Sequence, residues 1–188
     1  MKCTSCQSKK CRSNESCQIE SFQKDQIMNQ YHDQKTQNIV QAASELVDQG
    51  RAGTLSRIEE VIEFAHTMNY KKIGLAYCYG LEKEALMVMT LFERSGLKID
   101  SVSCTVGAFL QDEVNRKSEI HNVSCNPIGQ AQQMNQEGVD FVIVMGLCLG
   151  HDILFQKHIQ ADCTTLVVKD RTTGHSPLEA IKKLYEEE

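Results

Sequence analysis

Hydrophobic residues along most of the chain alternate between short continuous runs and stripes with helical spacing. Each of four short apolar runs is followed by a segment with the period of an amphipathic helix. Strands that are apolar on both sides and alternate with helices are typical of a parallel sheet covered on both faces. We therefore predict an α/β fold, a doubly wound and mainly parallel four-stranded sheet with helices on both faces. The predicted strands are 71–78, 97–106, 140–148 and 163–170, and the predicted helices after them are 81–96, 126–138, 151–159 and 176–188.

For the order of the strands we rely on common folds of this kind. Right-handed crossovers make a doubly wound sandwich the simplest packing. Within it we expect the order 2-1-3-4, with the switch between strands one and three, because this order is common among such folds. Ahead of the first strand, residues 19–49 carry the apolar stripe of one long helix that ends at Gly50. A second helix is expected after Ser56, which has capping-box spacing to Glu59. Residues 107–124 are polar and are predicted to be irregular.

The N-terminal segment has no apolar core of its own, but it contains four cysteines. Four thiolates within so short a segment can close around one metal ion, and metal binding would then order the segment. The spacing C-x2-C-x4-C-x5-C matches neither a zinc-ribbon pair nor the bacterial ferredoxin motif, so it indicates a metal without identifying it. We therefore expect residues 1–18 to be a Cys-rich metal-binding segment and 19–188 to be an α/β domain with a long N-terminal helix. The four candidate ligands are Cys3, Cys6, Cys11 and Cys17.

The number of cysteines changes the picture more than any other feature of the composition. The chain has nine among 188 residues, with no apolar signal peptide and no run near the roughly 20 apolar residues of a membrane span. We therefore expect a cytoplasmic protein without a membrane partner, in which clustered thiols bind metal or carry out redox chemistry more often than they form disulfides. The net charge of −5 gives no reason to expect nucleic acid.

Four further cysteines stand near the ends of the predicted strands. Cys78 ends the first strand, Cys104 lies near the end of the second, and Cys148 ends the third. Cys125 precedes the helix that leads into the third strand. Since ligands of open parallel sheets bind at the carboxyl ends of the strands, we expect these four thiols to gather there and bind a cofactor. An iron–sulfur cluster, most simply [4Fe–4S], and a Cys-rich zinc site both suit four thiolates. The alternative for each thiol is packing as a small buried side chain.

Five polar residues beyond the third and fourth strands are candidates for catalysis: His151, Asp152, Lys169, Arg171 and His175. His151 would be a ligand or a proton donor beside the thiols, whereas Asp152 could equally favour the positive end of its helix. The cations after the fourth strand would hold an anionic substrate, and an ion pair between Asp170 and Arg171 explains them equally well. Cys163 opens the fourth strand at the opposite end of the sheet, so we expect it in the core.

Several blocks of the sequence together point to a known family. They are the N-terminal cysteines, "RIEEVIEFA" (57–65), "IGLAYCYGLEKEA" (73–85), "SVSCTVG" (101–107), "CNPIGQA" (125–131), "GLCLGHD" (146–152) and "TTLVVKDRTTGHSPLEA" (164–180). With these blocks the chain resembles, over nearly its whole length, the prokaryotic domain of unknown function family 1847. Its members are usually labelled as metal-binding proteins. The family is associated with anaerobic bacteria and archaea, so the resemblance implies a setting that suits an oxygen-sensitive cluster. It implies no particular reaction.

The sequence thus predicts a metal-binding protein, foremost an iron–sulfur protein, with an N-terminal tetra-cysteine site and a second thiolate site at the carboxyl edge of the sheet. Clusters serve electron transfer as readily as catalysis, so a carrier and an enzyme of redox or sulfur-transfer chemistry both fit. The alternative is a zinc-binding, non-catalytic module, with zinc at the N-terminal site, that binds a small ligand or a protein partner. A metal-free thiol-redox protein ranks last, because the single C-x-x-C, at 3–6, precedes no thioredoxin-type strand–helix unit. An oligomer is compatible with each hypothesis.

Overall fold

The computed structural model describes residues 3–13, 15 and 22–186, and the chain divides into two compact units, residues 1–45 and 46–188. The first unit contains short 3-10 turns at Cys3–Ser5 and Lys10–Arg12, and the helices α1 (Lys24–Tyr31) and α2 (Gln34–Glu45). The division at residue 45 falls inside the segment 19–188 that we assigned to the α/β domain.

The prediction of one long helix over 19–49 is wrong. Helix α1 ends at Tyr31, and α2 begins at Gln34 after a break of two residues. Asp33 explains the break, because its carboxylate accepts hydrogen bonds from the amide (3.2 Å) and the hydroxyl (3.4 Å) of Thr36. Such a side chain caps the start of a new helix and so interrupts the first one. Residues 19–21 of the predicted helix lie outside the described residues.

The second unit follows the predicted alternation of strands and helices. Its regular elements are α3 (Arg57–Thr67), β1 (Ile73–Tyr77), α4 (Glu82–Arg94), β2 (Ile99–Ser103), α5 (Gln111–Val114), α6 (Pro127–Glu137), β3 (Phe141–Met145), α7 (His151–His158), β4 (Asp162–Val167) and α8 (Pro177–Glu186), with 3-10 turns at Asp48–Gly50 and Tyr79–Leu81. The region 107–124, predicted to be irregular, is largely so. It contains only the four-residue α5 and an isolated antiparallel bridge between Leu110 and Val123.

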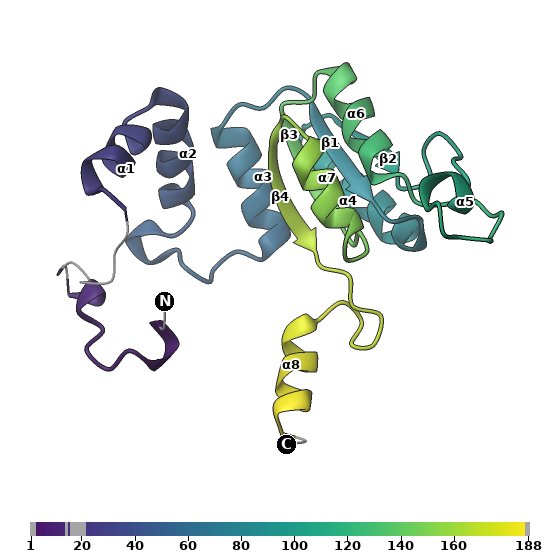
Figure 1. The fold of residues 1–188 in the computed structure, drawn as a ribbon. Helices are drawn as coiled ribbons and strands as arrows, with labels where there is room; N and C mark the ends of the chain where they lie inside the picture. The colour runs from purple at the N-terminus through teal and green to yellow at the C-terminus, as the bar shows by residue number, and fades with distance from the viewer. Residues whose placement is uncertain (1–2, 14, 16–21, 187–188) are drawn as a thin grey trace. The chain divides into compact units, whose positions relative to one another are not determined.

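The four strands form one sheet of order β2-β1-β3-β4, and every neighbouring pair is parallel (Figure 1). The predicted fold class and strand order are therefore confirmed. The register places Tyr77, the last residue of β1, between Ser103 of β2 and Met145 of β3. Strands β2, β1 and β3 thus end level with one another, which puts the residues that follow them at the same edge of the sheet.

Alternating side chains of the sheet support two separate cores, one on each face. On one face α3 and α4 pack against Ile73, Leu75 and Ile143. On the other face α6 and α7 pack against Ala76 and the valines of β3 (Figure 1). Helices on both faces bury a sheet in which every residue of the central strand β3 is buried.

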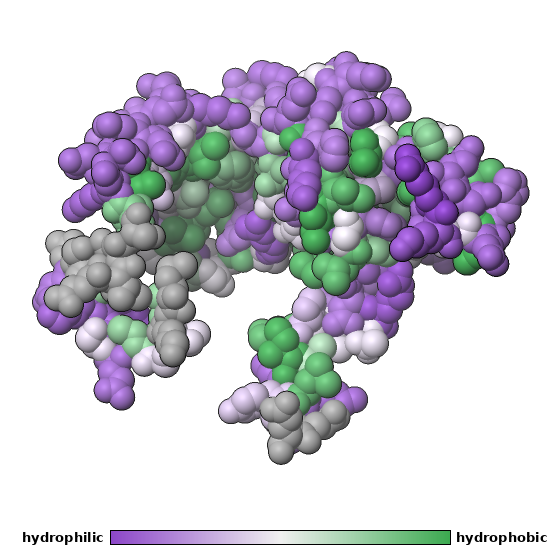
Figure 2. All heavy atoms as spheres, viewed as in Figure 1, coloured by the Kyte–Doolittle hydropathy of each residue, from purple (hydrophilic) through white to green (hydrophobic). Residues whose placement is uncertain are grey.

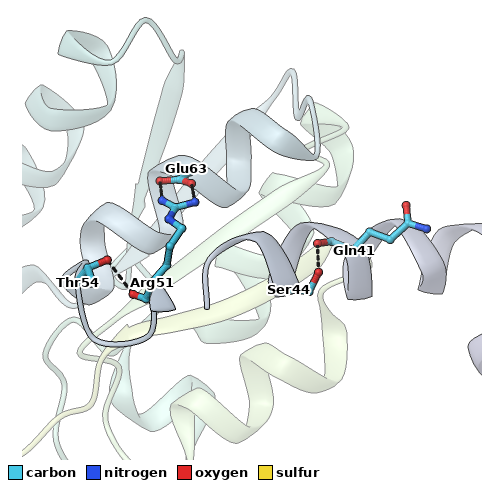
Figure 3. A network of polar contacts seen from close by, with 5 residues as sticks. All are labelled: Gln41, Ser44, Arg51, Thr54 and Glu63. Atoms are coloured by element: carbon cyan, nitrogen blue, oxygen red, sulfur yellow. Dashed lines mark hydrogen bonds and ion pairs between the residues drawn. The ribbon is translucent and has the colours of Figure 1, made fainter. Parts of the chain in front are cut away.

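The polypeptide that leads into α3 is held by polar contacts. Arg51 forms a two-pronged ion pair with Glu63 of α3, at 2.6 Å and 2.8 Å, and the backbone carbonyl of Arg51 accepts the Thr54 hydroxyl (Figure 3). This pairing lowers the pKa of Glu63, because the guanidinium donates hydrogen bonds to the carboxylate. The predicted capping box is present, with Ser56 and Glu59 satisfying each other's backbone groups.

Helix α8 has no buried residue among those described, in contrast to the other helices of the second unit apart from the short α5. Its aliphatic side chains are exposed, and Figure 2 shows a green patch in its lower part; these side chains are Leu178, Ile181 and Leu184. Tyr185 of the same helix is exposed as well. Within the described part of the chain, no helix has both the length and the apolar character required to cross a membrane.

The buried face of α4 gives a direct test of the core. Phe92 is fully buried among the residues of β1 and β3, whereas its neighbour Leu91 is 40% exposed. We expect Phe92→Ala to lower the free energy of unfolding by about 3–5 kcal/mol, because the transfer free energy of the ring is lost and a cavity is left. Leu91→Ala, the matched control, should cost less than about 1 kcal/mol. Urea denaturation under reducing conditions measures both, and equal losses would contradict this packing.

Candidate functional site

The backbone ladder of the sheet extends one residue beyond β1 and β2, and both of these extra residues are cysteines. The amide of Cys78 donates to the carbonyl of Met145 (3.1 Å), and the amide of Cys104 donates to the carbonyl of Tyr77 (3.0 Å). Because Tyr77 and Ser103 are in register, Cys78 and Cys104 occupy neighbouring positions on adjacent strands. Both thiols are buried.

Cys125 reaches the same edge from the other direction along the chain. The amide of Asn126 donates to the carbonyl of Cys104 at 2.6 Å, which fixes the start of α6 against the end of β2. The Cys125 thiol then lies 3.5 Å from the sulfur of Cys104, within hydrogen-bonding distance. The side chain of Asn126 caps α6 by accepting from the Gly129 amide, as predicted for an N-cap residue.

Cys148 follows β3 after a sharp turn. Gly146 makes this turn with a positive φ of 64°, and its amide bonds to the carbonyl of Val167 on β4 (2.8 Å). The carbonyl of Cys148 accepts the amides of His151 and Asp152, so this cysteine stands at the start of α7. Its side chain is partly exposed.

Two cations after β4 contact two of the thiols. The Lys169 ammonium donates to the sulfur of Cys78 at 3.4 Å, and the Arg171 guanidinium donates to the sulfur of Cys148 at 3.2 Å. The guanidinium is favoured in its charged form there, because the hydrogen bond to Cys148 raises the pKa of Arg171. A side chain at Gly80 would lie 3.8 Å from the sulfur of Cys78 and 3.9 Å from the ammonium of Lys169. Glycine at this position therefore leaves room beside the pair.

Burial and mutual repulsion shift the acidity of the two thiols at the β2 end. Burial is the main reason why the pKa of Cys104 rises to about 12, and the nearby sulfurs of Cys125 and Cys78 raise it further. An amide N–H from Tyr79 opposes this shift by donating to the sulfur of Cys104 at 3.4 Å. Burial also raises the pKa of Cys125, with contributions from Cys148 and Cys78, while Lys169 lowers it. The four thiols are thus electrostatic neighbours.

The loop after β4 is shaped by Asp170. Its carboxylate accepts the hydroxyl (2.7 Å) and amide (2.9 Å) of Thr172 and the amide of Thr173. These hydrogen bonds lower the pKa of Asp170 to about 2. His175, one of the catalytic candidates, closes the same loop: its ring Nδ1 accepts the amide of Asp170, and its own amide donates to the Asp170 carbonyl. The Asp170 carboxylate is therefore engaged within this turn, between the two cations that contact the thiols.

The candidates on α7 have different surroundings. Asp152 accepts the amides of Gly150 and Ile153, so its carboxylate serves the turn at the start of the helix. His151 is the first residue of α7, and its ring Nδ1 is buried with no hydrogen-bond partner among the described residues. A buried ring nitrogen without a partner is unusual, because buried polar atoms are normally hydrogen-bonded. The Asp152 carboxylate is thus used by the turn, whereas the buried Nδ1 of His151 has no hydrogen-bond partner among the described residues.

The N-terminal cysteines are only partly described. Cys3 and Cys11 are exposed and Cys6 is half-buried, and all three lie in or beside the two short 3-10 turns. Hydrogen bonds from Ser8 and from the amide of Lys9 lower the pKa of Cys6. Cys17, the fourth candidate ligand of this site, lies outside the described residues.

Throughout residues 3–13, 15 and 22–186, no three Cys, His, Asp or Glu side chains are arranged around one point in a way that could hold a single metal ion. At the sheet edge, Cys104 and Cys125 instead contact each other, and Cys78 and Cys148 each contact a cation. A small cavity of about 150 Å³ opens beside them and includes Lys169 in its lining. Its other lining residues are Val144, Leu147, Leu149, Asp152, Thr165, Val167 and Val168.

Two residues of the second unit were not predicted correctly from the sequence. Cys163, which we expected in the core, is exposed on the edge strand β4, although partial burial still raises the pKa of its thiol to about 11. Gln130 was missed, because a glutamine in a helix gives no distinctive signal. Fully buried, it donates from Nε2 to the carbonyls of Tyr77 and Val102, and so ties α6 to the ends of β1 and β2.

The fold and the edge together define a class: an all-parallel α/β protein with four thiols and two thiol-contacting cations at the carboxyl end of its sheet. The model of the family described as "Protein of unknown function (DUF1847)" matches residues 14–166, and the chain belongs to this family. The matched range includes the four cysteines of the edge and ends before Lys169. The chain is also similar to "Uncharacterized protein MJ0455" of Methanocaldococcus jannaschii, with 37% identity over 190 residues that cover 98% of this chain and 95% of that protein.

The lowered pKa of Asp170 predicts how its loop responds to pH. Its pKa is lowered on folding, so its contribution to the loop is complete above the ordinary value of 3.8 and is lost as the pH falls through about 2. The amide NMR signals of Thr172 and Thr173 should therefore titrate with a midpoint near 2. Asp170→Ala should accelerate amide hydrogen exchange at these two residues at neutral pH, whereas Asp100→Ala, at an exposed position of β2, should not. A midpoint near 3.8 would contradict the hydrogen bonding of this loop.

Proposed function

We propose that the protein binds a metal cofactor, foremost an iron–sulfur cluster, through the thiolates of Cys78, Cys104, Cys125 and Cys148, and that it serves redox or sulfur-transfer chemistry. The proposal rests on one observation: these thiols come from four separate segments of the chain and lie at the same end of one sheet, together with Lys169. Thiolates are soft donors that favour iron–sulfur clusters, copper(I) and zinc over magnesium or calcium.

The arrangement of the thiols favours a cluster over a single ion. A structural zinc site needs three or four donors at bonding distance from one point, and the described residues include no such group. In a [4Fe–4S] cluster each iron takes its own cysteine, so the four thiolates surround a larger object and need not converge on one ion. Four sulfurs spread along one edge, of which Cys104 and Cys125 meet and Cys78 and Cys148 contact cations, are compatible with that requirement.

The surrounding charge supports thiolate ligands. Ionising the buried thiols is costly, as the raised pKa values of Cys104 and Cys125 indicate. Lys169 and Arg171 donate to the other two sulfurs and would offset part of the negative charge of a cluster with its thiolates. Helix α7 begins directly after Cys148, and its positive N-terminal end acts in the same direction.

A bound cluster would supply one-electron redox chemistry at this edge. His151, whose buried Nδ1 has no hydrogen-bond partner among the described residues, would accept or hold a proton there. Lys169 lines the small cavity and would orient an anionic group of a substrate in it. Reduced thiolates persist in a reducing compartment, so a cytoplasmic setting with an electron or sulfur partner belongs to the proposal. The N-terminal cysteines remain a second predicted metal site, with zinc or a cluster as the occupant.

The alternative is a zinc-binding module without catalysis, in which zinc sits at the N-terminal site and the sheet edge binds a small ligand. The cavity beside Lys169 favours this second function, because apolar side chains make up most of its lining and one cation could fix an acidic ligand.

Metal analysis under anaerobic conditions tests the proposal. The intact protein should contain iron and acid-labile sulfide and absorb broadly in visible light. Cys78→Ser/Cys148→Ser should lose the metal of the edge, because a serine hydroxyl is a poor substitute for a soft thiolate. Cys163→Ser is the matched control, since this exposed thiol lies at the opposite end of the sheet, and its metal content should stay unchanged.

Circular dichroism of the reduced variants shows whether the fold survives each substitution. If the double variant and the wild type are both folded and contain equal amounts of iron and sulfide, the edge thiols bind no metal and serve only for packing. A colourless protein that contains only zinc would favour the alternative module instead.

A further inference from the structure

Cys104 and Cys125 are not only potential ligands. We propose that they form a dithiol–disulfide couple that exchanges with low-molecular-weight disulfides, and that its oxidised form withdraws two ligands from the sheet edge. The couple itself stands on geometry alone, and the control of metal binding rests on the proposed function. The 20 residues between the two cysteines contain no redox motif, so only the fold reveals the pair.

The two sulfurs are held face to face. They lie 3.5 Å apart, and within the described part of the chain theirs is the one hydrogen-bonding contact between two thiols. The backbones on either side are fixed as well, because the Asn126 amide bonds to the Cys104 carbonyl (2.6 Å) and the Asn126 side chain bonds to the Val106 carbonyl (3.1 Å). With the backbones anchored in this way and the sulfurs 3.5 Å apart, a small movement of the two side chains brings the sulfurs to the bond length of a disulfide.

A third contact closes the loop between the two cysteines. The Ser124 amide donates to the carbonyl of Phe109 at 2.8 Å, next to the bridge between Leu110 and Val123. These backbone contacts do not depend on the sulfurs. A disulfide can therefore form by rotation of two side chains, with no rearrangement of the strands or of α6.

The solvent exposure of the two thiols indicates the order in which they react. Cys104 is 1% exposed, whereas Cys125 is only half-buried, so an external disulfide meets Cys125 first. The Cys125 thiolate attacks one sulfur of the small disulfide, a mixed disulfide forms, and the first small thiolate leaves and takes up a proton. Cys104, as its thiolate, then attacks the Cys125 sulfur and expels the second small thiol. In sum, two protein thiols lose two electrons and two protons, and one small disulfide becomes two small thiols.

The remaining thiols of the edge have other partners. The sulfur of Cys78 accepts a hydrogen bond from the ammonium of Lys169, and the sulfur of Cys148 accepts one from the guanidinium of Arg171. Oxidation of the couple would leave these two sulfurs as the reduced ligands of the edge. A disulfide sulfur carries no thiolate charge, so an edge with two ligands would not retain a four-thiolate cofactor.

Peptide mapping of the full-length protein tests the couple. Anaerobically purified, metal-free reduced protein is incubated with glutathione disulfide, its remaining thiols are alkylated, and the digest is analysed by mass spectrometry. We expect a linked peptide pair that contains Cys104 and Cys125, in the wild type and equally in Cys163→Ser. In Cys104→Ser the reaction should stop at the mixed disulfide, with one glutathione on Cys125. In Cys125→Ser, the buried Cys104 should remain unmodified.

The wild-type digest decides the matter even if a variant fails to fold. Cys104 and Cys125 that stay fully alkylated, or that link to Cys78 or Cys148 instead, would overturn the couple. The metal arm repeats the oxidation on metal-loaded protein: the metal of the edge should be lost as the disulfide appears and should return after reduction. A disulfide that forms without loss of metal would overturn the control of metal binding. A reduced protein that takes up no metal would refute the proposed function, while the linked peptide would still decide on the couple.

Discussion

The parallel register of the sheet is the constraint on which the candidate site depends. Tyr77, Ser103 and Met145 are level with one another, so the chain leaves three neighbouring strands at the same height. The hydrogen-bond ladder then continues for one residue, and in β1 and β2 that residue is a cysteine. Parallel strands require crossover helices, and these helices cover both faces and leave the carboxyl edge as the place where polar chemistry is accessible.

The edge balances two opposing electrostatic effects. Burial and neighbouring sulfurs make the thiols of Cys104 and Cys125 harder to ionise. Lys169 and Arg171 contact the other two sulfurs, and the turn formed by Asp170 holds the loop that carries them. An edge of this kind favours neutral thiols when it is empty and thiolates when a cationic metal centre is present, so cofactor binding and thiol ionisation would be coupled.

Much of the architecture could be predicted from the sequence, because it depends on local periodicity. Apolar runs and helical stripes identified the strands and the longer helices of the second unit, and the observed strand order is the one expected from common folds of this kind. The same reasoning placed the four cysteines near the strand ends. The break at Asp33 was missed, because apolar residues keep their helical spacing on both sides of it. Whether Asp33 caps a new helix depends on the backbone conformation there, which the sequence pattern does not reveal. Cys163 was misplaced, since its burial depends on what covers the edge strand.

Pairwise contacts were beyond the sequence. Nothing local indicates that Cys125 meets Cys104 or that Lys169 meets Cys78, because each pair joins segments that only the tertiary fold brings together. The role of Gln130 was hidden for the same reason.

Anomalous X-ray diffraction at the iron absorption edge, from crystals of anaerobically purified protein, would show whether the carboxyl end of the sheet binds iron. We expect an iron peak there, bonded to the sulfurs of Cys78, Cys104, Cys125 and Cys148. An edge without an anomalous peak, or Cys78 and Cys148 on opposite sides of the molecule, would contradict it.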